Sequence, residues 1–146
     1  MKKLYFCISI VSVIFASSCS TSQVANSRID EVRQLNYLDS EFKRLPISEP
    51  IEEWEIGEKV KSQVSNALNQ KINDEASPGI RYRVQAIAYL DSGVRYLWFN
   101  GFCSSFYKEV DEYWKEIYVG IIDSGHCSFE GIYLLESDQV AEFTWG

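Results

Sequence analysis

Residues 81–102 constrain the fold of this chain most strongly. Apolar side chains occupy every second position along one side of the segment: Tyr82, Val84, Ala86, Ala88 and Leu90. A period of two predicts a β-strand with one apolar face. The triplet Asp91-Ser92-Gly93 is typical of a three-residue hairpin turn in which the glycine takes a positive φ. We therefore predict a hairpin whose second strand covers residues 94–102.

A second pair of strands follows the same logic. Residues 117–122 and 126–135 are mostly apolar and flank another Asp-Ser-Gly triplet, and residues 140–145 follow a further polar turn. We predict three more strands here, and hence an antiparallel meander of four to five strands. The charged and aromatic connection at residues 104–116 is long for a hairpin loop, and it could be either a loop or a short helical turn.

Two helical patterns precede the sheet. Apolar residues recur every three to four positions in residues 28–43, which predicts a short N-terminal amphipathic helix. A longer helix is predicted from Ser48 as N-cap, with Pro50 in its first turn and Gly57 weakening its start. Its apolar stripe comprises Ile56, Val60, Val64, Leu68 and Ile72. The predicted fold class is α+β, with helices packed on one face of the sheet. It is similar in outline to cystatin-like and NTF2-like domains, a likeness of architecture that implies no function.

The N-terminus has the pattern of a secretory signal. It begins Met1-Lys2-Lys3, continues with an apolar run at residues 4–16, and ends in small residues. The segment Ala16-Ser17-Ser18-Cys19 resembles the lipobox of bacterial lipoproteins, although that family usually has Leu where Ala16 stands. The resemblance implies cleavage after residue 18, lipid attachment to Cys19, and sorting to the periplasmic face of the outer membrane. The alternative is ordinary cleavage, which would release a periplasmic or secreted protein.

The cysteine count agrees with lipidation. Cys7 would leave with the signal peptide at residues 1–18, and a lipidated Cys19 would leave Cys103 and Cys127 as a pair. We expect a structural disulfide, worth roughly 3 to 4 kcal/mol in the chain-entropy model. The alternative is a redox or catalytic thiol, but the chain has no C-x-x-C motif. Residues 19–27 are small and polar and predict a tether, and residues 28–146 predict a single domain.

Charge and motif content narrow the classes of function. The formal net charge is −7, so the chain repels phosphates, and we expect no nucleic-acid partner. His126 is the only histidine, and with Asp123 and Glu130 it falls short of a zinc signature, so we expect no metal and no cofactor. As neighbours on a strand, His126 and Cys127 would face opposite ways, which argues against a catalytic dyad.

The remaining candidates are surfaces. The aromatic residues around the long connection form a candidate binding surface: Trp98, Phe106, Tyr107, Tyr113 and Trp114. The acidic run at residues 49–58 is either a solvated helix start or a docking face for a basic partner. We expect a lipid-anchored, non-enzymatic envelope protein that binds or inhibits another envelope protein.

Two alternatives stay open. One is a small envelope hydrolase that uses paired carboxylates, such as Asp111 or Glu112 with Glu116, or Glu130 with Glu142. The other is a purely structural envelope lipoprotein.

Overall fold

The predicted hairpin forms the centre of the sheet. Strand β3 (Tyr82–Asp91) pairs antiparallel with β4 (Val94–Cys103) over its whole length, from Tyr82 opposite Cys103 to Asp91 opposite Val94. The turn is one residue tighter than predicted. Only Ser92 and Gly93 connect the strands, and both have positive φ values, 52° and 79°. This is the backbone that matches the twist of a two-residue hairpin.

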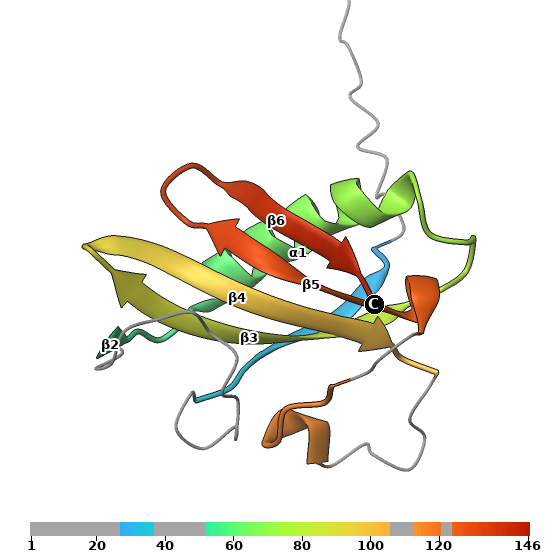
Figure 1. Cartoon of the computed structure of the whole chain (residues 1–146), viewed down its shortest axis with the longest axis horizontal. Coiled ribbons are helices and arrows are strands. Elements are labelled where there is room, and N and C mark those ends of the chain that lie inside the picture. Colours follow the sequence, from blue (N-terminus) through green and yellow to red (C-terminus); the bar gives the residue numbers. More distant parts are fainter. Residues whose placement is uncertain (1–26, 37–51, 106–112, 121–123) are drawn as a thin grey trace, which may run out of the picture.

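The computed structural model describes residues 27–36, 52–105, 113–120 and 124–146. Its other elements, in chain order, are β1 (Ile29–Gln34), β2 (Glu52–Glu53), α1 (Glu58–Asn73), the 3₁₀ turns η1 (Tyr113–Lys115) and η2 (Gly125–Cys127), β5 (Ser128–Leu134) and β6 (Gln139–Trp145). The described strands form one sheet in the order β1-β3-β4-β5-β6, with β2 also pairing with β3. Helix α1 lies across one face of this sheet (Figure 1). The α+β class is confirmed, but the sheet is mixed rather than purely antiparallel.

The N-terminal helix prediction is wrong for the described residues, because β1 is a strand that runs parallel to β3. The apolar spacing of three between Ile29 and Val32 would place them on opposite faces of a regular strand. A register shift between Ile29 and Glu31 adds a residue, as in a β-bulge, and both side chains are buried in the core. A bulged strand therefore gave the spacing of a helix. Residues 37–43 lie outside the described part of the chain.

The longer helix exists but begins later than predicted. Its N-cap is Gly57, and residues 52–53 form β2, which pairs antiparallel with the end of β3. The Trp54 N–H then donates to the Ala88 carbonyl at 3.3 Å, which extends this pairing. Glu52, Glu53 and Glu55 thus precede the helix instead of occupying its first turns. The predicted capping residues Ser48 and Pro50 lie outside the described residues.

The predicted strand at residues 117–122 is also not found. Residues 117–120 have no regular structure, and residues 121–122 are not among those described. After η2, strand β5 pairs antiparallel with both β4 and β6. The meander is therefore β3-β4-β5-β6, and the long connection runs from the end of β4 to the start of β5.

The main core lies between α1 and the sheet. The described buried side chains of this core include Val64, Leu68, Ile72, Val84, Ala86, Ala88, Leu97, Phe99, Phe129 and Tyr133. Gly101 shares this face of the sheet with Phe129, its direct partner on β5. A Cβ atom at Gly101 would overlap the Phe129 ring. Glycine is needed here because the aromatic ring occupies the place of a side chain.

We predict that Gly101→Ala lowers the free energy of unfolding by about 1 to 3 kcal/mol, because the added methyl group must displace the Phe129 ring. Phe129→Leu also destabilises the protein, but it makes room for the methyl group. Denaturant unfolding of the two single variants and the double variant would therefore show a smaller loss in the double variant than the sum. Simple additivity would contradict this steric account.

Candidate functional site

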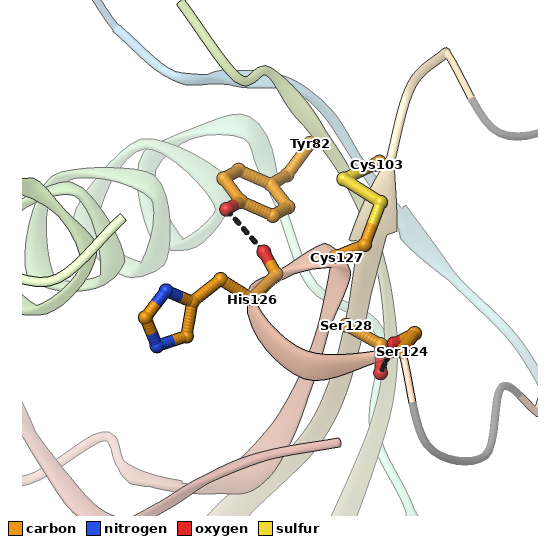
Figure 2. The surroundings of a disulfide bond; sticks show 6 residues. All are labelled: Tyr82, Cys103, Ser124, His126, Cys127 and Ser128. Atoms are coloured by element: carbon orange, nitrogen blue, oxygen red, sulfur yellow. Dashed lines mark hydrogen bonds between the residues drawn. A yellow bond between two sulfur atoms is a disulfide. The ribbon is translucent and has the colours of Figure 1, made fainter. Parts of the chain in front are cut away.

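The long connection is tied down at both ends by the disulfide between Cys103 and Cys127, which confirms the predicted pairing. Cys103 ends β4, and Cys127 ends η2 (Figure 2). The Tyr82 hydroxyl donates to the His126 carbonyl at 2.7 Å and holds the same turn to β3. Neither sulfur is a free thiol in this structure, so the bond acts as a structural link.

His126 lies in η2 and not in a strand, so the argument from strand alternation does not apply to it. Its side chain is exposed and points away from the disulfide (Figure 2). The imidazole instead contacts the Trp145 ring, with 4.7 Å between the ring centroids. The structure gives His126 no position from which to activate Cys127.

Two buried amides on the sheet face opposite α1 organise the end of the connection. Gln85 on β3 and Asn100 on β4 are direct partners and are almost fully buried. Gln85 Nε2 donates to the carbonyls of Trp114 and Ile117 at 2.6 and 2.8 Å. Gln85 Oε1 accepts from the Val119 N–H at 2.9 Å and from Asn100 Nδ2 at 3.3 Å. Every hydrogen-bonding position of the Gln85 amide is therefore used.

These bonds fix residues 113–119, which we call the cover segment, against this second face. Asn100 Nδ2 adds a bond of 2.6 Å to the Val119 carbonyl. Trp114 packs edge-on against Phe102 at 5.9 Å between ring centroids, and the Arg83 guanidinium lies 5.4 Å from the Trp114 ring. The cover segment is thus held by its own backbone groups and by one buried indole.

The predicted surface aromatics that the structure describes are either buried or exposed. Trp98 and Trp114 are only 6% and 1% exposed, so they offer little area to a partner. Tyr113 is 64% exposed, and Ile117, which the sequence placed in a strand, is 47% exposed. Phe106 and Tyr107 lie outside the described residues. Ile117 could not be recognised as exposed from the sequence, because an apolar residue in an apolar run is typical of a core strand.

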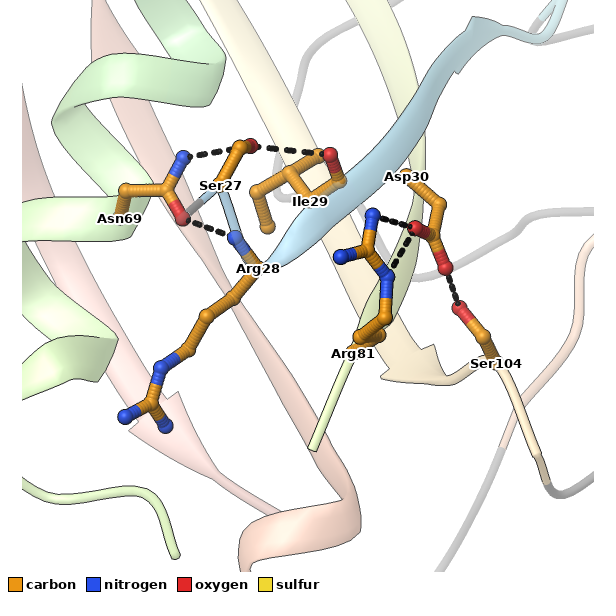
Figure 3. Close-up of polar contacts among 7 residues, drawn as sticks. All are labelled: Ser27, Arg28, Ile29, Asp30, Asn69, Arg81 and Ser104. Atoms are coloured by element: carbon orange, nitrogen blue, oxygen red, sulfur yellow. Dashed lines mark hydrogen bonds and ion pairs between the residues drawn. The ribbon is translucent and has the colours of Figure 1, made fainter. Parts of the chain in front are cut away.

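A second polar cluster fixes β1 to the sheet and the helix (Figure 3). Asp30 forms an ion pair with Arg81 and accepts from the Ser104 hydroxyl at 2.5 Å. Burial alone would raise the pKa of Asp30, but the hydrogen bonds from Arg81 and Ser104 outweigh it and lower the pKa. On the other side, the buried Asn69 of α1 accepts from the Arg28 N–H at 2.7 Å and donates to Ser27 Oγ at 3.1 Å.

Burial raises the pKa of three described phenols: less for Tyr82, and strongly for Tyr89 and Tyr133. Burial, with smaller effects from Tyr96 and nearby carboxylates, raises the pKa of Tyr89 to about 12. Tyr89 stacks on Tyr96 at 5.3 Å between ring centroids. Burial also raises the pKa of Tyr133, and the Asp138 carboxylate that accepts its hydroxyl adds to the effect. All three phenols stay neutral at physiological pH, so none is an activated acid or base.

Metal and carboxylate sites gain no support in the described part of the chain. No group of three or more His, Cys, Asp and Glu side chains there could hold a metal ion. Glu130 and Glu142 project from β5 and β6 and are both exposed. Glu116 is exposed beside the cover segment, while Asp111, Glu112 and Asp123 lie outside the described residues.

Comparison with protein-family models, with curated proteins and with solved structures finds no match to this chain. Within the ranges that the structure describes, no helix has the length and apolar character needed to span a membrane.

We predict that Gln85→Leu destabilises the protein by about 3 kcal/mol, because two buried carbonyls and one N–H lose their partner. The cover segment should then detach first. Limited proteolysis within residues 104–120 should accelerate, and the fluorescence of Trp114 should shift to the red. Gln70→Leu on the exposed side of α1 is the matched control. Unchanged proteolysis in the Gln85 variant would show that the amide does not hold the segment.

Proposed function

We propose that this protein is a lipid-anchored, non-enzymatic binding module of the bacterial envelope. In this proposal the chain is cleaved after residue 18, and lipid on Cys19 holds it at the periplasmic face of the outer membrane. The lipobox-like sequence supports the anchor. The disulfide between Cys103 and Cys127 supports an oxidising compartment outside the cytoplasm. The layout of one long helix across a sheet is similar in outline to cystatin-like and NTF2-like domains, but β1 departs from a simple antiparallel meander.

The observation that carries the binding role is the exposure of Tyr113 and Ile117 on a segment that is otherwise firmly attached. Exposed apolar side chains that are already ordered lose little conformational entropy when a partner covers them. Tyrosine is also enriched at protein interfaces, since it combines apolar area with a polar hydroxyl. These two residues are the large hydrophobic side chains that stand out from the described surface. We therefore propose that they contact an envelope protein.

The anchor leads to a first test. Cys19→Ala should move the protein from the membrane fraction to the soluble periplasmic fraction, because the acyl chains supply the membrane affinity. Cys7→Ala is the matched control and should leave the protein anchored, since that residue leaves with the signal peptide. Fractionation and intact mass measure the outcome. A Cys19→Ala protein that stays in the membrane fraction would contradict lipid anchoring.

The binding role leads to a second test. A photo-crosslinking amino acid in place of Tyr113 should give a discrete adduct with an envelope protein in intact cells, whereas the same group at the exposed Thr144 on β6 should not. Tyr113→Ala with Ile117→Ala should reduce recovery of that protein about tenfold, without lowering stability, because both side chains are exposed. Equal adducts at both positions, or none, would refute the assigned surface.

A further inference from the structure

Strand β1 lies at one edge of the described sheet. In a parallel pair, alternate residues direct their N–H and C=O groups to the same neighbour. Leu35 N–H donates to the Ala86 carbonyl at 2.8 Å, and the Arg28 carbonyl accepts from the Tyr82 N–H at 2.7 Å. With the register of Val32 opposite Val84 and Gln34 opposite Ala86, the backbone groups of Val32 and Gln34 point away from β3.

A groove follows this outer edge. Three hollows of about 400, 450 and 550 Å³ lie along β1, and Arg33 lines all of them. One hollow lies between β1 and α1, the next lies beside Trp54 and Ile56, and the last lies between the end of β1 and the cover segment. The edge of β1 is therefore flanked by the helix on one face of the sheet and by the cover segment on the other.

The charge of the groove indicates the kind of strand it would accept. The described lining contains six carboxylates: Asp30, Glu31, Glu53, Glu55, Glu58 and Glu116. It contains three cations: Arg33, Lys61 and Lys115. Within this set Lys61 forms an ion pair with Glu58 at 2.7 Å, and Asp30 is paired with Arg81 outside the lining. Four carboxylates and two cations of the lining lie outside these two pairs. The excess of carboxylates disfavours an acidic occupant and favours a basic one.

The opposite edge is less suited to this role. Both edge strands carry a register irregularity, β1 between Ile29 and Glu31 and β6 opposite Ile132 and Tyr133, so this feature does not distinguish them. A smaller hollow of about 280 Å³ touches only its first two residues, Gln139 and Val140. A groove along the strand is therefore found at the β1 edge and not at the described β6 edge.

We propose that an extended, basic segment of a partner protein adds as a strand alongside β1, between α1 and the cover segment. This mode of recognition uses backbone hydrogen bonds for affinity and side-chain contacts for specificity. Lysine or arginine side chains of the added strand meet the carboxylates of Glu31 and Glu55. The proposal rests on the proposed binding function and specifies the chemistry of its partner.

The test uses the whole disulfide-bonded protein and short synthetic peptides of alternating Lys and Val, or of alternating Glu and Val. The Lys–Val peptide should bind in low salt and the Glu–Val peptide should not. Hydrogen exchange followed by NMR should show the amides of Val32 and Gln34 slowing about tenfold or more when the Lys–Val peptide is added, because new hydrogen bonds protect them. The amides of Phe143 and Trp145 on β6 should not change.

Charge variants provide the matched comparison. Glu31→Lys with Glu55→Lys should weaken binding of the Lys–Val peptide about five- to tenfold, as expected for two partly screened ion pairs. Glu130→Lys with Glu142→Lys changes the net charge by the same amount, but on β5 and β6, the strands farthest from β1. This double variant should bind the Lys–Val peptide about as well as the unchanged protein. All four carboxylates are exposed, so folding should be preserved.

Three results would overturn the proposal: no binding of the Lys–Val peptide, binding without protection of Val32 and Gln34, or protection of the β6 amides instead. A loss of the Tyr113 crosslink with intact peptide protection would refute the proposed envelope contact alone. If the Tyr113 crosslink forms but the amides of Val32 and Gln34 are not protected by the peptide, strand addition alone is refuted. The two ideas can therefore fail separately.

Discussion

The second face of the sheet depends on a pair of side-chain amides. A sheet with a helix on only one face usually leaves the other face to solvent and gives it polar residues. Here Gln85 and Asn100 are polar, but they are buried, and they supply hydrogen bonds to backbone groups of the cover segment. Without them, the carbonyls of Trp114, Ile117 and Val119 would have to be desolvated against an apolar surface. The amides make it favourable for a segment whose only regular structure is the short 3₁₀ turn η1 to act as a third layer.

The two faces of the sheet are therefore stabilised in different ways. The face toward α1 is closed by apolar packing that includes Phe99, Phe129 and Tyr133. The opposite face has a smaller apolar cluster of Leu35, Ile87, Tyr89 and Trp98, beside the amide pair. Apolar packing tolerates small shifts of position. The hydrogen bonds of the two side-chain amides require a fixed register between β3, β4 and the cover segment. The disulfide separately joins the end of β4 to η2, just before β5.

Much of the central sheet could be predicted from sequence, because alternation and turn chemistry are local properties. This holds for the β3–β4 hairpin, for the apolar stripe of α1 and for the pairing of Cys103 with Cys127. Strand β1 could not be predicted, since a bulge gave it the period of a helix. The helix start was placed too early because glutamates are equally common before a helix and within its first turn. Gln85 and Asn100 gave no signal, as a polar residue in an alternating strand usually faces water. Of the candidate surface, only Tyr113 could be recognised in advance among the exposed described residues.

The direction of β1 has a mechanical consequence. The chain enters the described domain at Ser27 and runs at once into a strand parallel to β3. Tension applied at Ser27 along the strand, and resisted at the β3–β4 turn, would load the hydrogen bonds between β1 and β3 together in shear. They would not open one at a time, as they do when a strand is peeled from its end. Asn69 and the Asp30–Arg81 pair resist the same displacement from both sides of β1. The first strand of the described domain is thus joined to β3 in a geometry that resists being pulled from its N-terminal end.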